Sequence, residues 1–135
     1  MSDLPAGDGS APVKRAPVSL LILGAALAGC DGPSSVCTTE MRPGLQVTIT
    51  DSASGEPRAG AALAIARDGA YADTLDPGVS YGEVMITRQG AYERQGVYDV
   101  VVRAPGYRDW VQQGVMVRSG QCHVSVAHLE AKLQP

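Results

Sequence analysis

Apolar residues recur at every second position along much of this chain, and this alternation limits the fold more than any other feature. Leu45, Val47 and Ile49 would lie on one face of a strand, with polar residues between them on the other face. This is the pattern of a strand with one buried face, and helical periodicity is nearly absent. The 16 glycines and 9 prolines among 135 residues supply the turns that many short strands need. We therefore expect an all-β fold.

Seven segments carry the alternation, and glycine, proline, aspartate and serine separate them. The strongest segment would place Tyr98, Val100 and Val102 toward the core, and the second would place Leu63 and Ile65 there. Seven short strands with turn signals between them are typical of two antiparallel sheets packed face to face. The predicted strands are 45–50, 61–66, 70–75, 81–87, 97–103, 109–117 and 121–129.

The first thirty residues have the layout of a targeting signal rather than of a folded domain. Lys14 and Arg15 precede an apolar stretch of eleven residues, 18–28. That stretch fits the apolar region of a signal peptide and is shorter than the roughly 20 residues that cross a bilayer. We therefore expect residues 1–29 to be a signal peptide that is removed from the mature chain.

The end of this leader resembles the lipobox of bacterial lipoproteins in four residues, Leu27, Ala28, Gly29 and Cys30. Small residues leave the peptide bond before the cysteine accessible, and the thiol can form a thioether with a diacylglyceryl group. The resemblance implies that Cys30 carries the lipid, and that palmitate-like acyl chains anchor the mature protein in a membrane. The alternatives are an ordinary signal peptide, which would give a secreted soluble module, or a buried strand with an incidental cysteine.

The lipobox resemblance also implies a place in the bacterial cell envelope, at the inner or the outer membrane. Asp31 follows the lipobox and resembles the inner-membrane retention signal of enteric bacteria. That rule transfers poorly to other bacteria, so both membranes stay open. We expect residues 30–44, which begin with the lipid-carrying cysteine and a Gly-Pro-Ser-Ser stretch, to tether the lipid to the fold.

The sequence contains three cysteines. If Cys30 carries lipid, Cys37 and Cys122 remain as one pair in an oxidising compartment. A disulfide between them would close a loop of about 85 residues and stabilise the fold by about 4–5 kcal/mol in the chain-entropy model. The alternatives are two thiols or a metal pair, and a zinc site would need at least one more ligand nearby.

Two stretches resemble carboxypeptidase regulatory-like domains, a family of transthyretin-like sandwiches. The first stretch, 47–61, carries turn signals at Gly55 and Pro57, and the second, 96–107, alternates apolar residues up to an Ala-Pro-Gly-Tyr turn. The resemblance covers residues 45–129. It implies a seven-stranded antiparallel β-sandwich of the transthyretin-like or immunoglobulin-like kind, preceded by the lipoprotein signal peptide.

A third similarity links the two resemblances. Residues 90–94 taken together with 122–124 resemble small bacterial lipoproteins that carry a carboxypeptidase regulatory-like domain. With the domain ending at residue 129, residues 130–135 would be a short C-terminal tail.

The sequence offers no recognisable catalytic site, metal site or cofactor motif. His123 and His128 lie five residues apart on one predicted strand, hence on opposite faces, so they would not bind one metal ion together. Glu93 and Arg94 would form an exposed ion pair at the rim rather than a catalytic or recognition pair. A net charge of −3 gives no basic surface for nucleic acid.

Trp110 and Tyr107 form the candidate interface, because aromatic residues at the end of a sandwich often anchor partners. Trp110 would otherwise cap the core beneath the neighbouring turn. We expect a non-enzymatic, lipid-anchored envelope module with a binding or structural role, whose candidate partner is an envelope protein or a glycan. The alternative is a small envelope hydrolase on the same scaffold. A pocket that gathers a histidine with arginine or serine side chains would favour that alternative.

Overall fold

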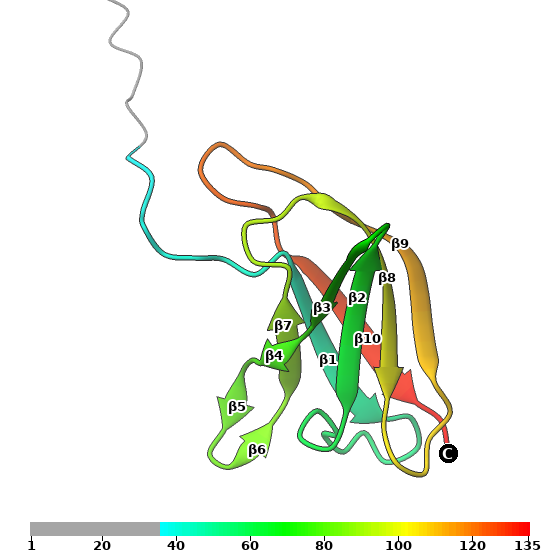
Figure 1. Ribbon diagram of the computed structural model, residues 1–135. Helices are drawn as coiled ribbons and strands as arrows, with labels where there is room; N and C mark the ends of the chain where they lie inside the picture. Colours follow the sequence, from blue (N-terminus) through cyan, green and yellow to red (C-terminus); the bar gives the residue numbers. More distant parts are fainter. Residues whose placement is uncertain (1–35) are drawn as a thin grey trace, which may run out of the picture. The chain divides into compact units, whose positions relative to one another are not determined.

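The computed structural model describes residues 36–135, and within this range the chain forms strands and no helix (Figure 1). The predicted signal peptide 1–29, with its lipobox residues, and Cys30 lie outside the described residues. No segment of residues 36–135 forms a helix long and apolar enough to cross a membrane. The predicted all-β class is confirmed.

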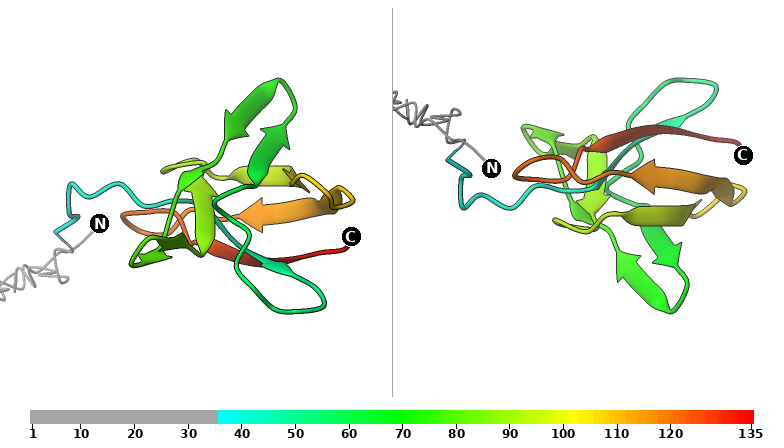
Figure 2. Two further views of the ribbon diagram at one scale, coloured as in Figure 1. Left: turned by 90° about the horizontal axis from the view of Figure 1, so that it is seen from below. Right: turned by 90° about the horizontal axis from the view of Figure 1, so that it is seen from above.

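Ten strands build the domain, and three of them are only two residues long. Two four-stranded sheets contain eight of the strands, in the orders β10-β1-β7-β4 and β3-β2-β8-β9, and β5 with β6 forms a separate hairpin (Figures 1 and 2). The strands are β1 (Leu45–Asp51), β2 (Leu63–Asp68), β3 (Tyr71–Thr74), β4 (Asp76–Pro77), β5 (Ser80–Tyr81), β6 (Val84–Met85), β7 (Thr87–Gly90), β8 (Gly96–Arg103), β9 (Trp110–Val117) and β10 (Ala127–Leu133).

The core lies between the two sheets and follows the predicted alternation of two strands. From β1 it receives Leu45, Val47 and Ile49, each fully buried. From β8 it receives Tyr98, Val100 and Val102, which are also fully buried. The predicted inward faces of these two strands are confirmed, and each sheet contributes one of them.

The predicted inward face of the second strand is wrong. On β2, Ala64 and Ala66 are fully buried, whereas Leu63 is 47% exposed and Ile65 is only partly buried. Pairing with β8 decides this face, because Ala64 lies opposite the buried Val102 and directly paired residues share a face. The larger side chains of β2 therefore line the outer face of the sheet.

The end of the chain also differs from the prediction. The strand expected at 121–129 begins only at Ala127, and residues 130–133 of the expected tail 130–135 form the second half of β10. Leu129, Ala131 and Leu133 of this strand are buried. Residues before Ala127 form a loop instead. β10 pairs with β1 in parallel, with Asp51 opposite Leu133. The sandwich is therefore not purely antiparallel, and the domain continues past residue 129.

The middle of the chain is more divided than the alternation predicts. The predicted strand 81–87 is split by a turn at Gly82, whose φ is +59°, into parts of the β5–β6 hairpin and the start of β7. Strand backbone has a negative φ, so a continuous strand does not pass through Gly82, where glycine readily adopts the positive value. β7 runs to Gly90 and pairs with β1, so the segment between the predicted strands 81–87 and 97–103 begins with part of a central strand.

The loops of the sandwich gather at two opposite ends. At the tether end, residues 36–44 approach β1 beside the 91–95 turn and the 118–126 loop. At the far end, the 52–62 loop and the 104–109 turn lie beside the last residues of the chain (Figures 1 and 2). Backbone hydrogen bonds join each set, for example from Gly44 to the Ala91 carbonyl and from Arg108 to the Gln134 carbonyl.

Candidate functional site

The predicted disulfide is present at the tether end. Cys37 and Cys122 are bonded, with their Cα atoms 5.2 Å apart and a sequence separation of 85. The bond joins the segment before β1 to the 118–126 loop. The backbone N–H of Glu93 also donates to the Arg42 carbonyl. The predicted tether 30–44 is therefore attached to the domain from Cys37 onward.

A histidine beside the disulfide connects a hydroxyl to a carboxylate. Thr38 Oγ1 lies 3.0 Å from His123 Nε2, and His123 Nδ1 lies 2.7 Å from Glu93 Oε1. Glu93 also accepts backbone N–H bonds from Arg42 at 2.7 Å and Val124 at 3.3 Å. The pKa of Glu93 is lowered, chiefly by the Arg42 N–H and further by His123. A hydroxyl, an imidazole and a carboxylate in this order resemble the nucleophile, base and orienting acid of hydrolases.

Sequence reasoning missed this arrangement, although the predicted disulfide contained the signal for it. Thr38 and His123 each follow one of the two bridged cysteines directly in sequence. Joining Cys37 to Cys122 therefore brings Thr38 and His123 together. No local motif marks Glu93, because it reaches the histidine from a turn 30 residues away.

The predicted ion pair between Glu93 and Arg94 is wrong. Arg94 Nη1 donates instead to Asp68 Oδ2 at 2.9 Å and to the Tyr98 hydroxyl at 2.8 Å. Its guanidinium lies 3.9 Å from the centre of the Tyr71 ring. Glu93 has a positive φ of 50°, so the chain turns there and the two neighbouring side chains leave in different directions. Arg94 serves to join β2, β3 and β8 above the core.

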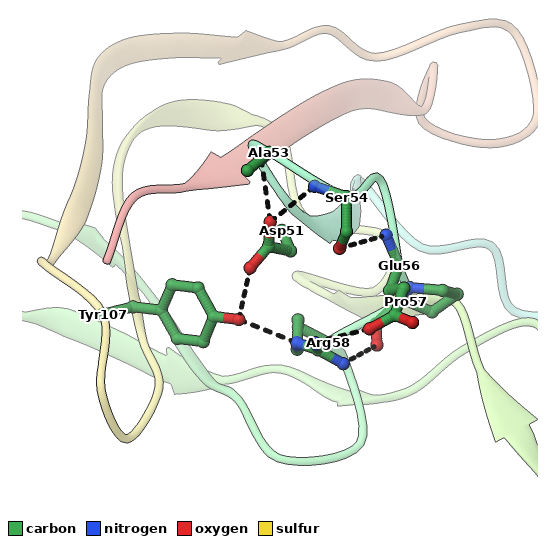
Figure 3. Close-up of polar contacts among 7 residues, drawn as sticks. All are labelled: Asp51, Ala53, Ser54, Glu56, Pro57, Arg58 and Tyr107. Carbon is green, nitrogen blue, oxygen red and sulfur yellow. Dashed lines mark hydrogen bonds and ion pairs between the residues drawn. The ribbon is translucent and has the colours of Figure 1, made fainter.

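Tyr107 lies at the far end and is committed to a network within the domain (Figure 3). Its hydroxyl donates to Asp51 Oδ2 at 2.6 Å and accepts from Arg58 Nε at 2.8 Å. The other carboxylate oxygen of Asp51 accepts the backbone N–H groups of Ala53 and Ser54, each at 2.8 Å. These bonds, that of Tyr107 foremost, lower the pKa of Asp51 to about 2. Tyr107 thus ties the 104–109 turn to the 52–62 loop.

The network predicts how stability depends on pH. The folded-state pKa of Asp51 is about 2, below its ordinary value of 3.8. Its carboxylate therefore stabilises the fold fully above about pH 4, and this contribution is lost as the pH falls through the folded-state value. We expect Tyr107→Phe to reduce stability by a constant amount above about pH 4, and by a shrinking amount below it. Urea unfolding between pH 2 and pH 6 measures this difference.

The exposed Tyr81 provides the control for this experiment. Tyr81→Phe also removes one phenol hydroxyl, but its side chain is 75% exposed on the β5–β6 hairpin, so its unfolding curves should match those of the unsubstituted protein. A Tyr107→Phe effect that stays equal from pH 2 to pH 6 would contradict the assigned hydrogen bond to the ionised Asp51.

Trp110, the other candidate interface residue, begins β9 and has two environments. Its side chain is partly buried and packs against the core. It also lines an open hollow of about 240 Å³ at the far end, the Trp110 hollow, whose other lining residues are Arg108, Asp109, Val111, Lys132 and Gln134. Trp110 therefore packs against the core and still exposes part of its surface in the hollow.

Two further hollows lie on the β3-β2-β8-β9 sheet. One, of about 300 Å³, lies on its outer face and includes Ile65, Val101 and Val111. The other, of about 530 Å³, is a shallow surface at the ends of β8 and β9 and includes Val97 and Met116. Neither histidine lines any of the three hollows. Within residues 36–135, no three His, Cys, Asp or Glu side chains are grouped to hold a metal ion.

No protein-family model matches this chain, and no curated protein matches its sequence. The similarity to carboxypeptidase regulatory-like domains therefore rests on the sequence motifs within 47–61 and 96–107.

Proposed function

We propose that this protein is a lipid-anchored module of the bacterial cell envelope, whose carboxypeptidase regulatory-like sandwich binds an envelope partner without catalysing a reaction. The observation that carries the proposal is the disulfide between Cys37 and Cys122. Disulfides persist in exported proteins and are rare in the reducing cytosol. Export in turn requires a leader, and the sequence supplies one at its first thirty residues.

The disulfide also supports the role given to the third cysteine. Because Cys37 and Cys122 bond to each other, neither is the residue to be lipidated, and Cys30 is the remaining cysteine of the sequence. It stands in the lipobox-like Leu-Ala-Gly-Cys tetrad. Two of the three cysteines therefore form a structural disulfide, and the third is the residue that we propose to carry the lipid.

The position of the disulfide limits the distance between the domain and its proposed lipid anchor. Cys30 precedes Cys37 by seven residues, which span at most about 25 Å when fully extended. The lipid would thus attach close to the tether end.

A small envelope hydrolase is the second candidate function, and the Thr38–His123–Glu93 arrangement favours it. Its hydrogen-bond distances of 3.0 Å and 2.7 Å suit proton transfer from the hydroxyl to the imidazole. A hydrolase would also need space for a substrate beside Thr38. None of Thr38, His123 and Glu93 lines any of the three hollows described above, although the shallow one at the ends of β8 and β9 includes Gln95 and Ser119 from the same two loops. We therefore prefer a structural role for this arrangement, which joins the disulfide-bonded loop to the 91–95 turn.

Replacement of the lipobox cysteine tests the proposal. We expect Cys30→Ser to accumulate as a precursor that keeps its leader and takes up no labelled palmitate, because serine lacks the thiol that accepts the diacylglyceryl group. Gel mobility and palmitate labelling in the bacterial host measure both outcomes. Cys37→Ser is the control, which removes a disulfide sulfur seven residues downstream of Cys30 and should still be processed and labelled. Normal maturation and labelling of Cys30→Ser would remove the lipoprotein assignment.

A further inference from the structure

The Trp110 hollow is built where β9 begins and β10 ends. The backbone N–H of Arg108 donates to the Gln134 carbonyl at 2.8 Å, which brings the start of β9 beside the residues that follow β10. Lys132 is an exposed residue of β10 next to this junction. The volume of about 240 Å³ lies below the roughly 300–1,000 Å³ of pockets that enclose drug-sized ligands. The hollow therefore suits a ligand of about one ring.

The hollow is positively charged on a protein whose net charge is −3. Arg108 and Lys132 line it, and neither takes part in an ion pair with another residue of the 36–135 range. Its one lining acid, Asp109, is bonded to Arg103 at 2.8 Å. Two uncompensated cations side by side favour an anionic ligand, and a guanidinium group matches a carboxylate with two parallel hydrogen bonds.

The remaining lining residues fit a ligand that combines hydroxyls with an apolar face. Trp110 is partly buried and offers a flat indole surface, whose negative face attracts C–H groups such as those of a sugar ring. Gln134 has an amide that can both donate to and accept from hydroxyls. An aromatic surface, two cations and an amide together match a sugar that bears a carboxylate.

The hollow lies at the end of the sandwich opposite the disulfide. Arg108 and Lys132 lie at the far end, whereas the disulfide that holds the chain near its proposed anchor lies at the tether end. β1 runs between the two ends with seven residues, a length of about 20 Å at the usual strand rise.

We propose that the Trp110 hollow binds a carboxylate-bearing sugar unit of an envelope glycan. Arg108 and Lys132 hold the carboxylate, and the sugar ring stacks on Trp110. This inference rests on the proposed envelope location and specifies the partner as an acidic glycan.

Fluorescence of Trp110, the one tryptophan of the sequence, provides a direct test with the full-length lipidated protein in detergent micelles. Titration with tetragalacturonate should change the emission and saturate, whereas the methyl-esterified tetramer, which lacks the charge, should leave it unchanged. Arg108→Gln and Lys132→Gln should each weaken binding by about tenfold or more, because each removes a charged hydrogen-bond donor. Arg67→Gln is the matched control, since it removes the same charge from the outer face of β2, and its affinity should stay within about twofold.

Four results would overturn the proposal. They are no saturable change with tetragalacturonate, equal binding of the methyl ester, equal weakening by Arg67→Gln, and competition by inorganic phosphate at the affinity of the sugar. The first shows that no such site exists, and the others show that the carboxylate, the hollow or the sugar ring is not recognised. Palmitate labelling at Cys30 does not depend on any of these four results. Failure of the sugar site would therefore leave the proposed anchoring intact, and failure of the sugar site is distinguishable from failure of the anchor.

Discussion

Replacing Cys37 by alanine is expected to lower the free energy of unfolding by about 4–5 kcal/mol, the value that chain entropy assigns to a loop of this length. The bond closes a loop with a sequence separation of 85, which includes β1 to β9 and therefore most of the sandwich. For a domain of about 100 residues, each kcal/mol corresponds to roughly 4–8 °C in Tm. We therefore expect the Tm of Cys37→Ala to fall by at least about 15 °C.

Three comparisons distinguish the effect of losing the disulfide on stability from the effect of changing a cysteine side chain. Cys122→Ala should cost as much as Cys37→Ala, and the double variant should cost no more than either, because both substitutions remove one shared interaction. Reducing agent should lower the Tm of the unsubstituted protein to that of the double variant and leave the double variant unchanged. Thermal unfolding under oxidising and reducing conditions measures all three. If reducing agent leaves the Tm of the unsubstituted protein unchanged, this would contradict the stabilising role of the disulfide.

Leu133→Ala is expected to destabilise the domain by about 2–5 kcal/mol, as large-to-small changes in a packed core do. Leu133 is fully buried at the end of β10 and lies opposite Asp51 of β1. Its backbone carbonyl also accepts the N–H of Ser52 at 2.8 Å. Truncation of Leu133 would therefore leave a cavity between the sheets at the far end.

The matched control is Leu63→Ala, the same change at a residue that is 47% exposed. We expect it to cost less than about 1 kcal/mol, because substitutions at exposed positions have small effects. Chemical denaturation of both variants measures the contrast. A larger loss of stability for Leu63→Ala than for Leu133→Ala would contradict the exposure of Leu63 and the burial of Leu133. It would instead favour the sequence-based expectation that Leu63 faces the core and that residues 130–135 form a tail.

Alternation predicted the buried face best where large apolar side chains recur at every second position. The faces of β1 and β8 follow from such patterns, since each buries three large side chains at every second position. On β2 the pattern was ambiguous, because small alanines alternate with Leu63 and Ile65 and either face could be apolar. Pairing with β8 chose the alanine face, and a partner strand is tertiary information that a local pattern does not contain.

The C-terminal boundary failed for a related reason. Residues 121–129 contain apolar positions typical of a strand, but the disulfide at Cys122 and an isolated bridge between Ser119 and Val124 hold the first part of this segment in a loop. β10 instead begins at Ala127 and follows the buried alternation through Leu133. The charged residues between the buried positions made this stretch resemble a polar tail.

Of the candidate site residues, the disulfide pair was predictable and the polar networks were not. Counting cysteines and assigning one to lipid left Cys37 and Cys122 as partners. By contrast, Tyr107 reaches Asp51 across 56 residues and His123 reaches Glu93 across 30 residues. Such contacts depend on which loops the fold brings to the same end of the sandwich, and neither spacing nor composition encodes this directly.

Mass spectrometry of the protein extracted from bacterial membranes tests the central claim most directly. A mature chain whose first residue is Cys30 carrying a diacylglyceryl thioether, together with a peptide pair in which Cys37 is linked to Cys122, is the predicted result. A mature, exported chain that bears an unmodified thiol at Cys30 would contradict it.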